Sequence, residues 1–164
     1  AIHYRCGDNF VGHYGFLPFS AFKRYIPVKG TKTIYVLADK RSRKTTAKQH
    51  RAAKCDAIFT ALFDYLRTQF PAATVVIRRG DDLTVDLVRL ASAPVTICSV
   101  STFCLWPAFI NNSTTVYFPA TKLVARGNAD LDLGFKWITQ PSVVLGAPYE
   151  FLPTPKLINA LVNS

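Results

Sequence analysis

Residues 95–118 read VTICSVSTFCLWPAFINNSTTVYF, and this stretch decides the fold class. Two short β-branched runs, Val95–Cys98 and residues 115–118, lie at its ends and are typical of buried strands. Between them, the hydroxyl of Ser101 or Thr102 can cap the start of a helix. A strand, a helix and a second strand in this order form a βαβ unit with parallel strands. The stretch therefore predicts an α/β domain.

The same alternation of apolar runs and helical patterns continues upstream. We expect further strands at residues 2–5, 33–38 and 74–77, and helices at residues 19–25, 55–70 and 82–91. Helices in these positions cover both faces of a sheet, which predicts a three-layer, Rossmann-like domain with a parallel sheet of about five strands. We assign residues 1–120 to this domain. Residues 121–164, punctuated by Gly and Pro, are predicted to be an irregular extension packed on it.

Length and charge narrow the class of protein. A chain of 164 residues suits one domain, and no apolar run reaches the roughly 18 residues that a membrane-spanning helix requires. Twenty Lys and Arg against ten Asp and Glu leave a formal charge of +10. This excess favours a polyanionic partner: a nucleic acid, an anionic lipid or a small molecule that carries phosphate.

The four cysteines are Cys6, Cys55, Cys98 and Cys104. None belongs to a C-x-x-C pair, which disfavours a zinc site. They allow three complete disulfide pairings, and the sequence does not choose among them. The chain opens without an initiator Met, on what resembles the second half of a buried strand, and we interpret it as a fragment of a longer protein.

Ligands of open parallel sheets bind beyond the carboxyl ends of the strands. Three segments follow predicted strands at this edge: residues 5–8, Asp39 with the basic run at residues 40–54, and residues 99–103. We expect the binding residues in these three places.

The first of these segments reads His3-Tyr4-Arg5-Cys6-Gly7-Asp8. An arginine suits a diphosphate because its planar guanidinium donates two charge-assisted hydrogen bonds at once. Gly7 lets the backbone approach a ligand, and Asp8 can hold the arginine in one rotamer. An ordinary salt bridge followed by a turn, with His3 in the core, would give the same pattern.

The third segment reads Ser99-Val100-Ser101-Thr102-Phe103. Hydroxyls and free N–H groups at a helix start can bind an anion, although simple N-capping explains the same residues. Upstream, the carboxylate of Asp86 could accept hydrogen bonds from the N–H groups of a guanine or be an ordinary helix residue.

Taken in order, these segments resemble the fucosyltransferase superfamily, and most closely its α1,2-type members. The pattern of those enzymes, H-x-R-R-G-D followed by D-x-x-L-M and S-S-F-S-W-W, corresponds here to HYRCGD, DLVRLA and STFCLW, which begin at His3, Asp86 and Ser101. The resemblance covers about residues 1–120. The chain departs from the pattern at Cys6, where the family has a second arginine, and at Leu105, where it has a tryptophan.

The resemblance implies a GT-B enzyme of which this chain is the C-terminal, nucleotide-sugar-binding half. Arg5 would bind the β-phosphate of GDP-fucose, and Asp86 would contact the guanine. Arg5 and Asp8 are the implied catalytic residues, with Asp8 first of all a partner of Arg5. The implied donor-binding residues are His3, Arg5, Gly7, Asp86, Ser101, Thr102 and Phe103.

The implied reaction is transfer of fucose from GDP-fucose to a glycan hydroxyl. It would need no metal or cofactor, because Arg5 and helix N–H groups would neutralise the departing diphosphate. The partners would be a nucleotide sugar and a glycan acceptor, with an N-terminal domain and a membrane anchor supplied upstream of this chain. Two overlapping glycosylation sequons at residues 111–114 agree with a location in the Golgi or secretory-pathway lumen.

A non-catalytic basic module, a degenerate transferase, is the alternative. The basic run at residues 40–54 could hold phosphate-bearing ligands or nucleic acid, although it lacks the interleaved aromatic residues that bind single strands by stacking. We interpret Arg78-Arg79-Gly80-Asp81 as a solvated loop. Asp130-Leu131-Asp132 resembles a metal-binding D-x-D motif, but it follows no predicted strand, and we interpret it as a chance match.

Overall fold

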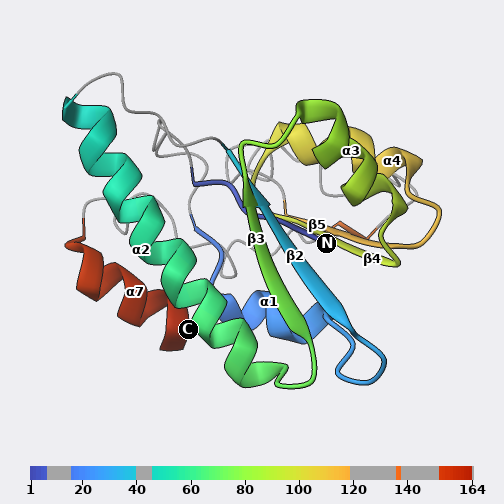
Figure 1. Ribbon diagram of the computed structural model, residues 1–164, viewed down its shortest axis with the longest axis horizontal. Helices are drawn as coiled ribbons and strands as arrows, with labels where there is room; N and C mark the ends of the chain where they lie inside the picture. Colours follow the sequence, from blue (N-terminus) through green and yellow to red (C-terminus); the bar gives the residue numbers. More distant parts are fainter. Residues whose placement is uncertain (7–15, 40–45, 119–135, 138–151, 164) are drawn as a thin grey trace.

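The computed structural model describes residues 1–6, 16–39, 46–118, 136–137 and 152–163. Within these ranges six parallel strands form one sheet in the order β3-β2-β1-β4-β5-β6 (Figure 1). This is the strand order of a doubly wound, Rossmann-like sheet, and it reverses between β1 and β4. The predicted three-layer α/β class is confirmed.

In the described ranges, a helix is the next element after β1, β2, β3, β4 and β6, whereas β5 is followed by β6. The strands are β1 (Ile2–His3), β2 (Thr33–Ala38), β3 (Thr74–Arg79), β4 (Val95–Cys98), β5 (Thr114–Tyr117) and β6 (Lys136–Trp137). The helices are α1 (Phe19–Tyr25), α2 (Thr46–Gln69), α3 (Leu83–Ser92), the 3₁₀ turn η1 (Thr102–Cys104), α4 (Leu105–Ile110) and α7 (Thr154–Asn163).

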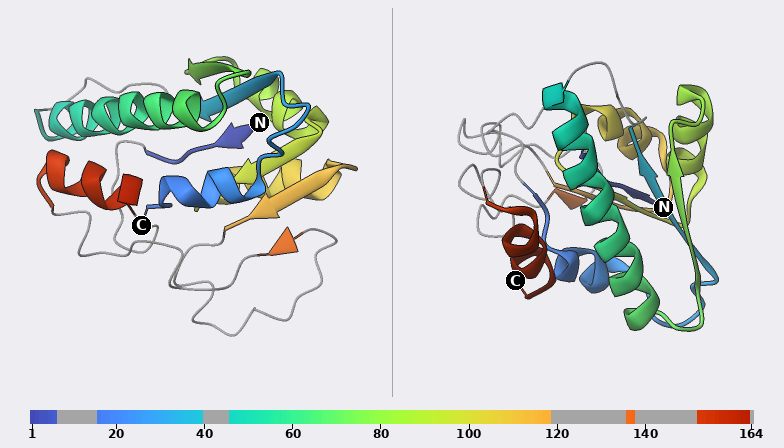
Figure 2. Two further views of the ribbon diagram at one scale, coloured as in Figure 1. Left: turned by 90° about the horizontal axis from the view of Figure 1, so that it is seen from below. Right: turned by 60° about the vertical axis from the view of Figure 1, so that its left-hand side comes forward.

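The helices form two layers on opposite faces of the sheet. α1, α2 and α7 contact one another on one face (Figure 2), whereas α3 and α4 pack together on the other (Figure 1). The larger of two buried clusters lies beneath α1, α2 and α7, and the smaller lies beneath α3 and α4.

Neighbouring strands are in register, so residues aligned across the sheet share a face. Ile2 is aligned with Val36 of β2, and both lie in the larger cluster. His3 is aligned with Leu37 of β2 and Cys98 of β4, which lie in the smaller cluster. β1 therefore presents Ile2 to one helical layer and His3 to the other.

The four cysteines form two disulfides. Cys6 is bonded to Cys55 and joins the segment after β1 to α2, whereas Cys98 is bonded to Cys104 and closes the loop between β4 and α4. Of the three pairings that the sequence allows, the structure has this one.

The structure differs from the sequence prediction at the start of α2 and in residues 121–164, predicted to be irregular, where α7 is a regular helix that packs against α1 and α2. α2 begins at Thr46 rather than at residue 55, because residues 46–53 are mostly good helix formers that lack an apolar stripe. β6 lies in the predicted irregular extension and pairs with β5, and a strand of two residues carries too little pattern to be predicted. No helix in the described ranges is both long and apolar enough to cross a membrane.

Candidate functional site

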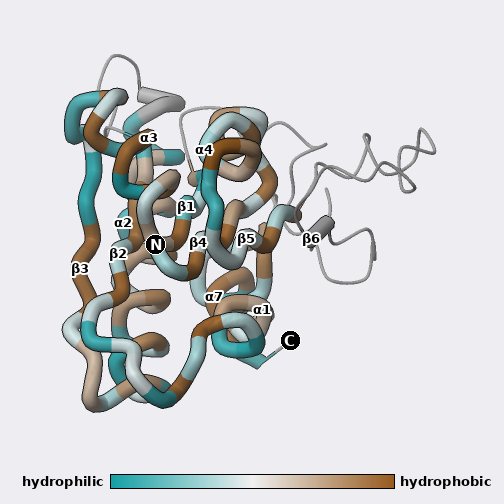
Figure 3. Tube along the Cα trace, turned by 90° about the vertical axis from the view of Figure 1, so that its right-hand side faces the viewer, coloured by the Kyte–Doolittle hydropathy of each residue, from teal (hydrophilic) through white to brown (hydrophobic). Residues whose placement is uncertain are grey.

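A pocket of about 280 Å³ lies at the carboxyl edge of the sheet, beside the point where the strand order reverses. β1, β2, β3, α3 and η1, or the residues that follow them, each contribute to its wall. Its lining residues are His3, Arg5, Ala38, Asp39, Gly80, Asp81, Leu83, Asp86 and Phe103. β3 is apolar along its middle and hydrophilic at its carboxyl end (Figure 3).

Four of the residues predicted to bind a donor come together in this pocket: His3, Arg5, Asp86 and Phe103. Each belongs to a segment that the sequence predicted at the carboxyl edge or in the helix beside it. Gly7 and Asp8, also predicted, lie outside the described residues.

His3 is a buried, neutral histidine. Its side chain is 3% exposed, and its ring centroid lies 5.2 Å from that of Phe103. Burial, and secondarily the positive charge of Arg5, lower the pKa of His3 from 6.5 to about 3. In the described part of the chain its Nδ1 atom has no hydrogen-bond partner, although His3 lines the pocket. The imidazole is therefore uncharged, and its Nδ1 atom is both buried and without a hydrogen-bond partner among the described residues.

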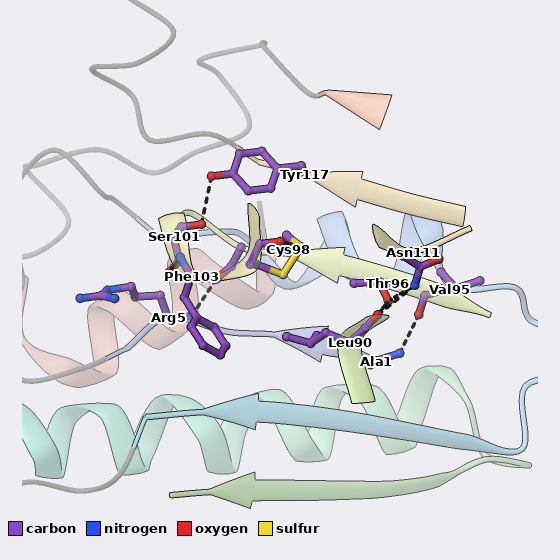
Figure 4. The surroundings of a disulfide bond; sticks show 12 residues. Ala1, Arg5, Leu90, Val95, Thr96, Cys98, Ser101, Phe103, Asn111 and Tyr117 are labelled. Carbon is purple, nitrogen blue, oxygen red and sulfur yellow. Dashed lines mark hydrogen bonds between the residues drawn. A yellow bond between two sulfur atoms is a disulfide. The ribbon is translucent and has the colours of Figure 1, made fainter. Parts of the chain in front are cut away.

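Arg5 is held in place through its backbone. Its N–H group donates to the hydroxyl of Ser99 at 2.7 Å, and the N–H group of Ser99 donates to the carbonyl of His3 at 2.9 Å. These two bonds join the ends of β1 and β4 at the point where the strand order reverses. They fix the backbone of Arg5, from which its half-buried side chain extends. In Figure 4 this side chain is drawn near Phe103.

Asp86 and Asp81 share one cation. The guanidinium of Arg89 forms an ion pair with Asp81 and donates to Oδ1 of Asp86 at 3.3 Å. Burial, and then the charge of Asp81, raise the pKa of Asp86, while Arg89 opposes that rise. Arg89 itself lies over the ring of Tyr35, 6.0 Å from its centroid. The carboxylate of Asp86 is thus oriented by Arg89, whose guanidinium packs over the Tyr35 ring.

Ser101 and Thr102 do not line the pocket. The Ser101 hydroxyl accepts from the Phe103 N–H at 3.2 Å, and its carbonyl accepts from the Tyr117 hydroxyl at 3.0 Å (Figure 4). Thr102 is exposed. Ser101 therefore caps η1 and holds the loop that carries Phe103, which is the N-capping alternative that the sequence left open.

The Arg78–Asp81 motif is more than a solvated loop, and that interpretation is wrong for two of its side chains. Arg79 forms an ion pair with Asp56 and lies 4.8 Å from the ring centroid of Phe59, and Asp81 is paired with Arg89. Gly80 and Asp81 also line the pocket. Their partners come from other elements, so spacing along the chain could not reveal them.

A larger cavity of about 600 Å³ lies at the opposite edge, near the amino ends of β1, β2 and β4. None of the predicted site residues lines it. Because ligands of parallel sheets bind at the carboxyl edge, the smaller pocket is the candidate functional site. Its volume is close to the lower limit of roughly 300 Å³ for small-molecule sites.

The described ranges contain no group of three or more His, Cys, Asp or Glu side chains placed to hold a metal ion. No family model matches this sequence, and neither a curated protein nor a solved structure is significantly similar to it.

Proposed function

We propose that this chain is the donor-binding part of a fucosyltransferase-like glycosyltransferase, which transfers fucose from GDP-fucose to a glycan hydroxyl. One observation carries the proposal. Three segments that resemble the superfamily's motifs, far apart in sequence, each contribute to one pocket at the carboxyl edge of the sheet, through His3, Arg5, Asp86 and Phe103.

The charges of the pocket support a nucleoside diphosphate as the ligand. Arg5 supplies a permanent cation that can bind a diphosphate through two hydrogen bonds. The carboxylates of Asp39, Asp81 and Asp86 lie on the side of β2, β3 and α3, and they can only accept hydrogen bonds when ionised. A ligand with an anionic end and an end rich in N–H and O–H donors matches this arrangement.

In the proposed reaction, the bond between the sugar carbon and the diphosphate oxygen breaks as the acceptor oxygen bonds to that carbon. The negative charge that develops on the diphosphate is stabilised by the Arg5 guanidinium, which extends from a backbone held by the Ser99 hydroxyl. His3 stays neutral beside it and adds a hydrogen-bonding atom rather than a second charge. The acceptor hydroxyl transfers its proton to a base that we do not assign.

The two disulfides support a location in the secretory pathway. Disulfides persist in oxidising compartments and are rare in the cytosol. The pairs Cys6–Cys55 and Cys98–Cys104 include all four cysteines of the chain. On the basis of the disulfides and of the resemblance, we propose a Golgi location. The resemblance also leads us to propose a nucleotide sugar and a glycan acceptor as the partners.

A calorimetric titration of the purified chain, with a chelator present, tests the proposal. We expect GDP to bind more tightly than UDP or ADP. Arg5→Gln should weaken GDP binding by about 10- to 100-fold, which corresponds to one charge-assisted hydrogen bond or a pair of them. Arg67→Gln is the matched control, because Arg67 lies on α2, on the other face of the sheet, against Phe63.

The basic-module alternative predicts the opposite result. GDP would give no heat, whereas a short DNA would bind with an affinity that falls steeply with salt. Within the described part of the basic run, Lys54 donates to the carbonyl of Leu152 at 2.7 Å and so contributes to packing between α2 and the segment before α7.

A further inference from the structure

Asp39 is the acidic residue of the pocket that the fold does not use. It follows β2 directly, is exposed and lines the pocket. Asp81 and Asp86 are both paired with Arg89. No hydrogen bond or ion pair joins the Asp39 carboxylate to the described residues. The carboxylate is therefore available to a ligand.

Asp39 and Arg5 follow neighbouring strands and line the same pocket. His3 is aligned with Leu37, and the Tyr4 N–H group donates to the Leu37 carbonyl at 3.0 Å, so β1 and β2 end next to each other. Because side chains alternate along a strand, Asp39 lies on the same face as Leu37, which is the face of His3 and α3.

The backbone of Asp39 is fixed to the end of β3. The Arg79 side chain donates through Nε to the Asp39 carbonyl at 3.3 Å, and the Gly80 N–H group donates to the Ala38 carbonyl at 3.3 Å. These bonds tie the backbone of Asp39 to the end of β3, beside the pocket that Asp39 and Arg5 both line.

An ionised carboxylate beside a phosphate-binding arginine repels a phosphate but suits a neutral diol, since its oxygens can accept from both hydroxyls. In Rossmann-like sheets, an acidic side chain at the end of the second strand is well placed for a ribose.

We propose that Asp39 binds the ribose hydroxyls of the nucleotide, so that the pocket selects ribonucleotides over 2′-deoxyribonucleotides. This inference rests on the proposed function, in that it takes the ligand to be a nucleoside diphosphate. It adds a specificity-determining residue that lies outside the motifs on which the resemblance depends.

Paired titrations of the purified chain with GDP and 2′-deoxy-GDP test the inference. We expect the unmodified chain to prefer GDP by about ten-fold, the loss that follows removal of one hydrogen bond to a charged group. Asp39→Ala should abolish the preference: it should weaken GDP binding by more than this factor, because the contacts to both hydroxyls are lost, and weaken 2′-deoxy-GDP binding less, because only the contact to the 3′-hydroxyl is lost. Asp39→Asn, which keeps one acceptor oxygen, should lie between the two.

Asp64→Asn is the matched control, because Asp64 is an exposed aspartate on α2, far from this edge and on the other face of the sheet. It should change neither affinity. Equal thermal midpoints for the Asp39 variants and the unmodified chain exclude loss of folding as the cause.

The outcomes separate this inference from the proposed function. If Asp39→Ala keeps the preference for GDP, or weakens GDP and 2′-deoxy-GDP equally, the ribose assignment is wrong and the GDP proposal stands. If UDP or ADP binds more tightly than GDP, the fucose-donor proposal is wrong, and the same comparison with that nucleotide and its 2′-deoxy form decides the ribose assignment. If no nucleotide binds, both are overturned.

Discussion

At the scale of single residues, burial decides the chemistry of His3. An unfolded histidine titrates near pH 6.5, whereas the folded pKa is about 3. The unfolded chain therefore binds a proton between these values that the folded chain does not bind. It follows that the contribution of His3 to stability is complete above pH 6.5 and decreases as the pH falls toward 3.

We therefore expect the stability of the unmodified chain to fall relative to that of His3→Gln below pH 6.5, by up to about 1.4 kcal/mol per pH unit. Urea unfolding of both chains between pH 7.5 and 4.5 measures this difference, and the other titrating groups cancel in the comparison. If the difference in free energy of unfolding between the two chains stays constant over this range, burial does not lower the pKa of His3.

Arg89 provides a second prediction at this scale. Its guanidinium lowers the pKa of Asp86 against the effects of burial and of Asp81. Replacing Arg89 with Met should therefore raise the Asp86 pKa further, which carboxyl-carbon NMR can follow in a pH titration. Arg67→Met, on the opposite face of the sheet, should leave that pKa unchanged. An unaltered Asp86 pKa in Arg89→Met would show that the ion pair does not set its charge.

The sequence predicted four of the binding residues that meet in the pocket, but it also predicted Ser101 and Thr102, which do not line it, and missed Gly80 and Asp81, which do. His3, Arg5 and Phe103 could be placed together because each follows a parallel strand, and those strands end at one edge. The ion pairs of Asp81 and Asp86 with Arg89 depend on side-chain positions in space, which spacing along the chain does not encode.

At the scale of elements, the two disulfides restrain loops of very different length. Cys6 and Cys55 are 49 residues apart, whereas Cys98 and Cys104 are 6 apart. Closing the longer loop restricts the unfolded chain more, so the chain-entropy estimate is about 4 kcal/mol for Cys6–Cys55 and about 2 kcal/mol for Cys98–Cys104.

We therefore expect Cys6→Ala/Cys55→Ala to lower the free energy of unfolding more than Cys98→Ala/Cys104→Ala. Urea unfolding of the two double variants measures both losses. The reverse order would mean that the short loop next to Phe103 contributes mainly through packing in the folded state rather than through the unfolded chain.

Elements with an apolar pattern were predictable and those without one were not. The strands β2 to β5 and the helix α3 carry apolar runs or an amphipathic pattern, and the structure places them close to the predicted ranges. The first turns of α2 and the short β6 lack such a pattern. Helix-forming side chains account for the first turns of α2, and pairing with β5 accounts for β6.

At the scale of the whole molecule, the two cavities at the amino and carboxyl edges of the sheet are alternative sites for the ligand. The larger lies at the amino edge of the sheet and the smaller at the carboxyl edge, where the resemblance to fucosyltransferases places the donor. The formal charge of +10 attracts an anion to either edge and does not decide between them.

The most direct test is therefore to map where GDP binds on the folded chain. In a titration of the ¹⁵N-labelled chain with GDP, followed by amide NMR, we predict shifts at His3, Arg5, Asp39, Asp86 and Phe103, with Thr31 and Ser92 in the larger cavity unchanged. Shifts confined to Thr31, Ser92 and their neighbours, or no shifts at saturating GDP, would contradict the assignment of the carboxyl-edge pocket as the nucleotide site.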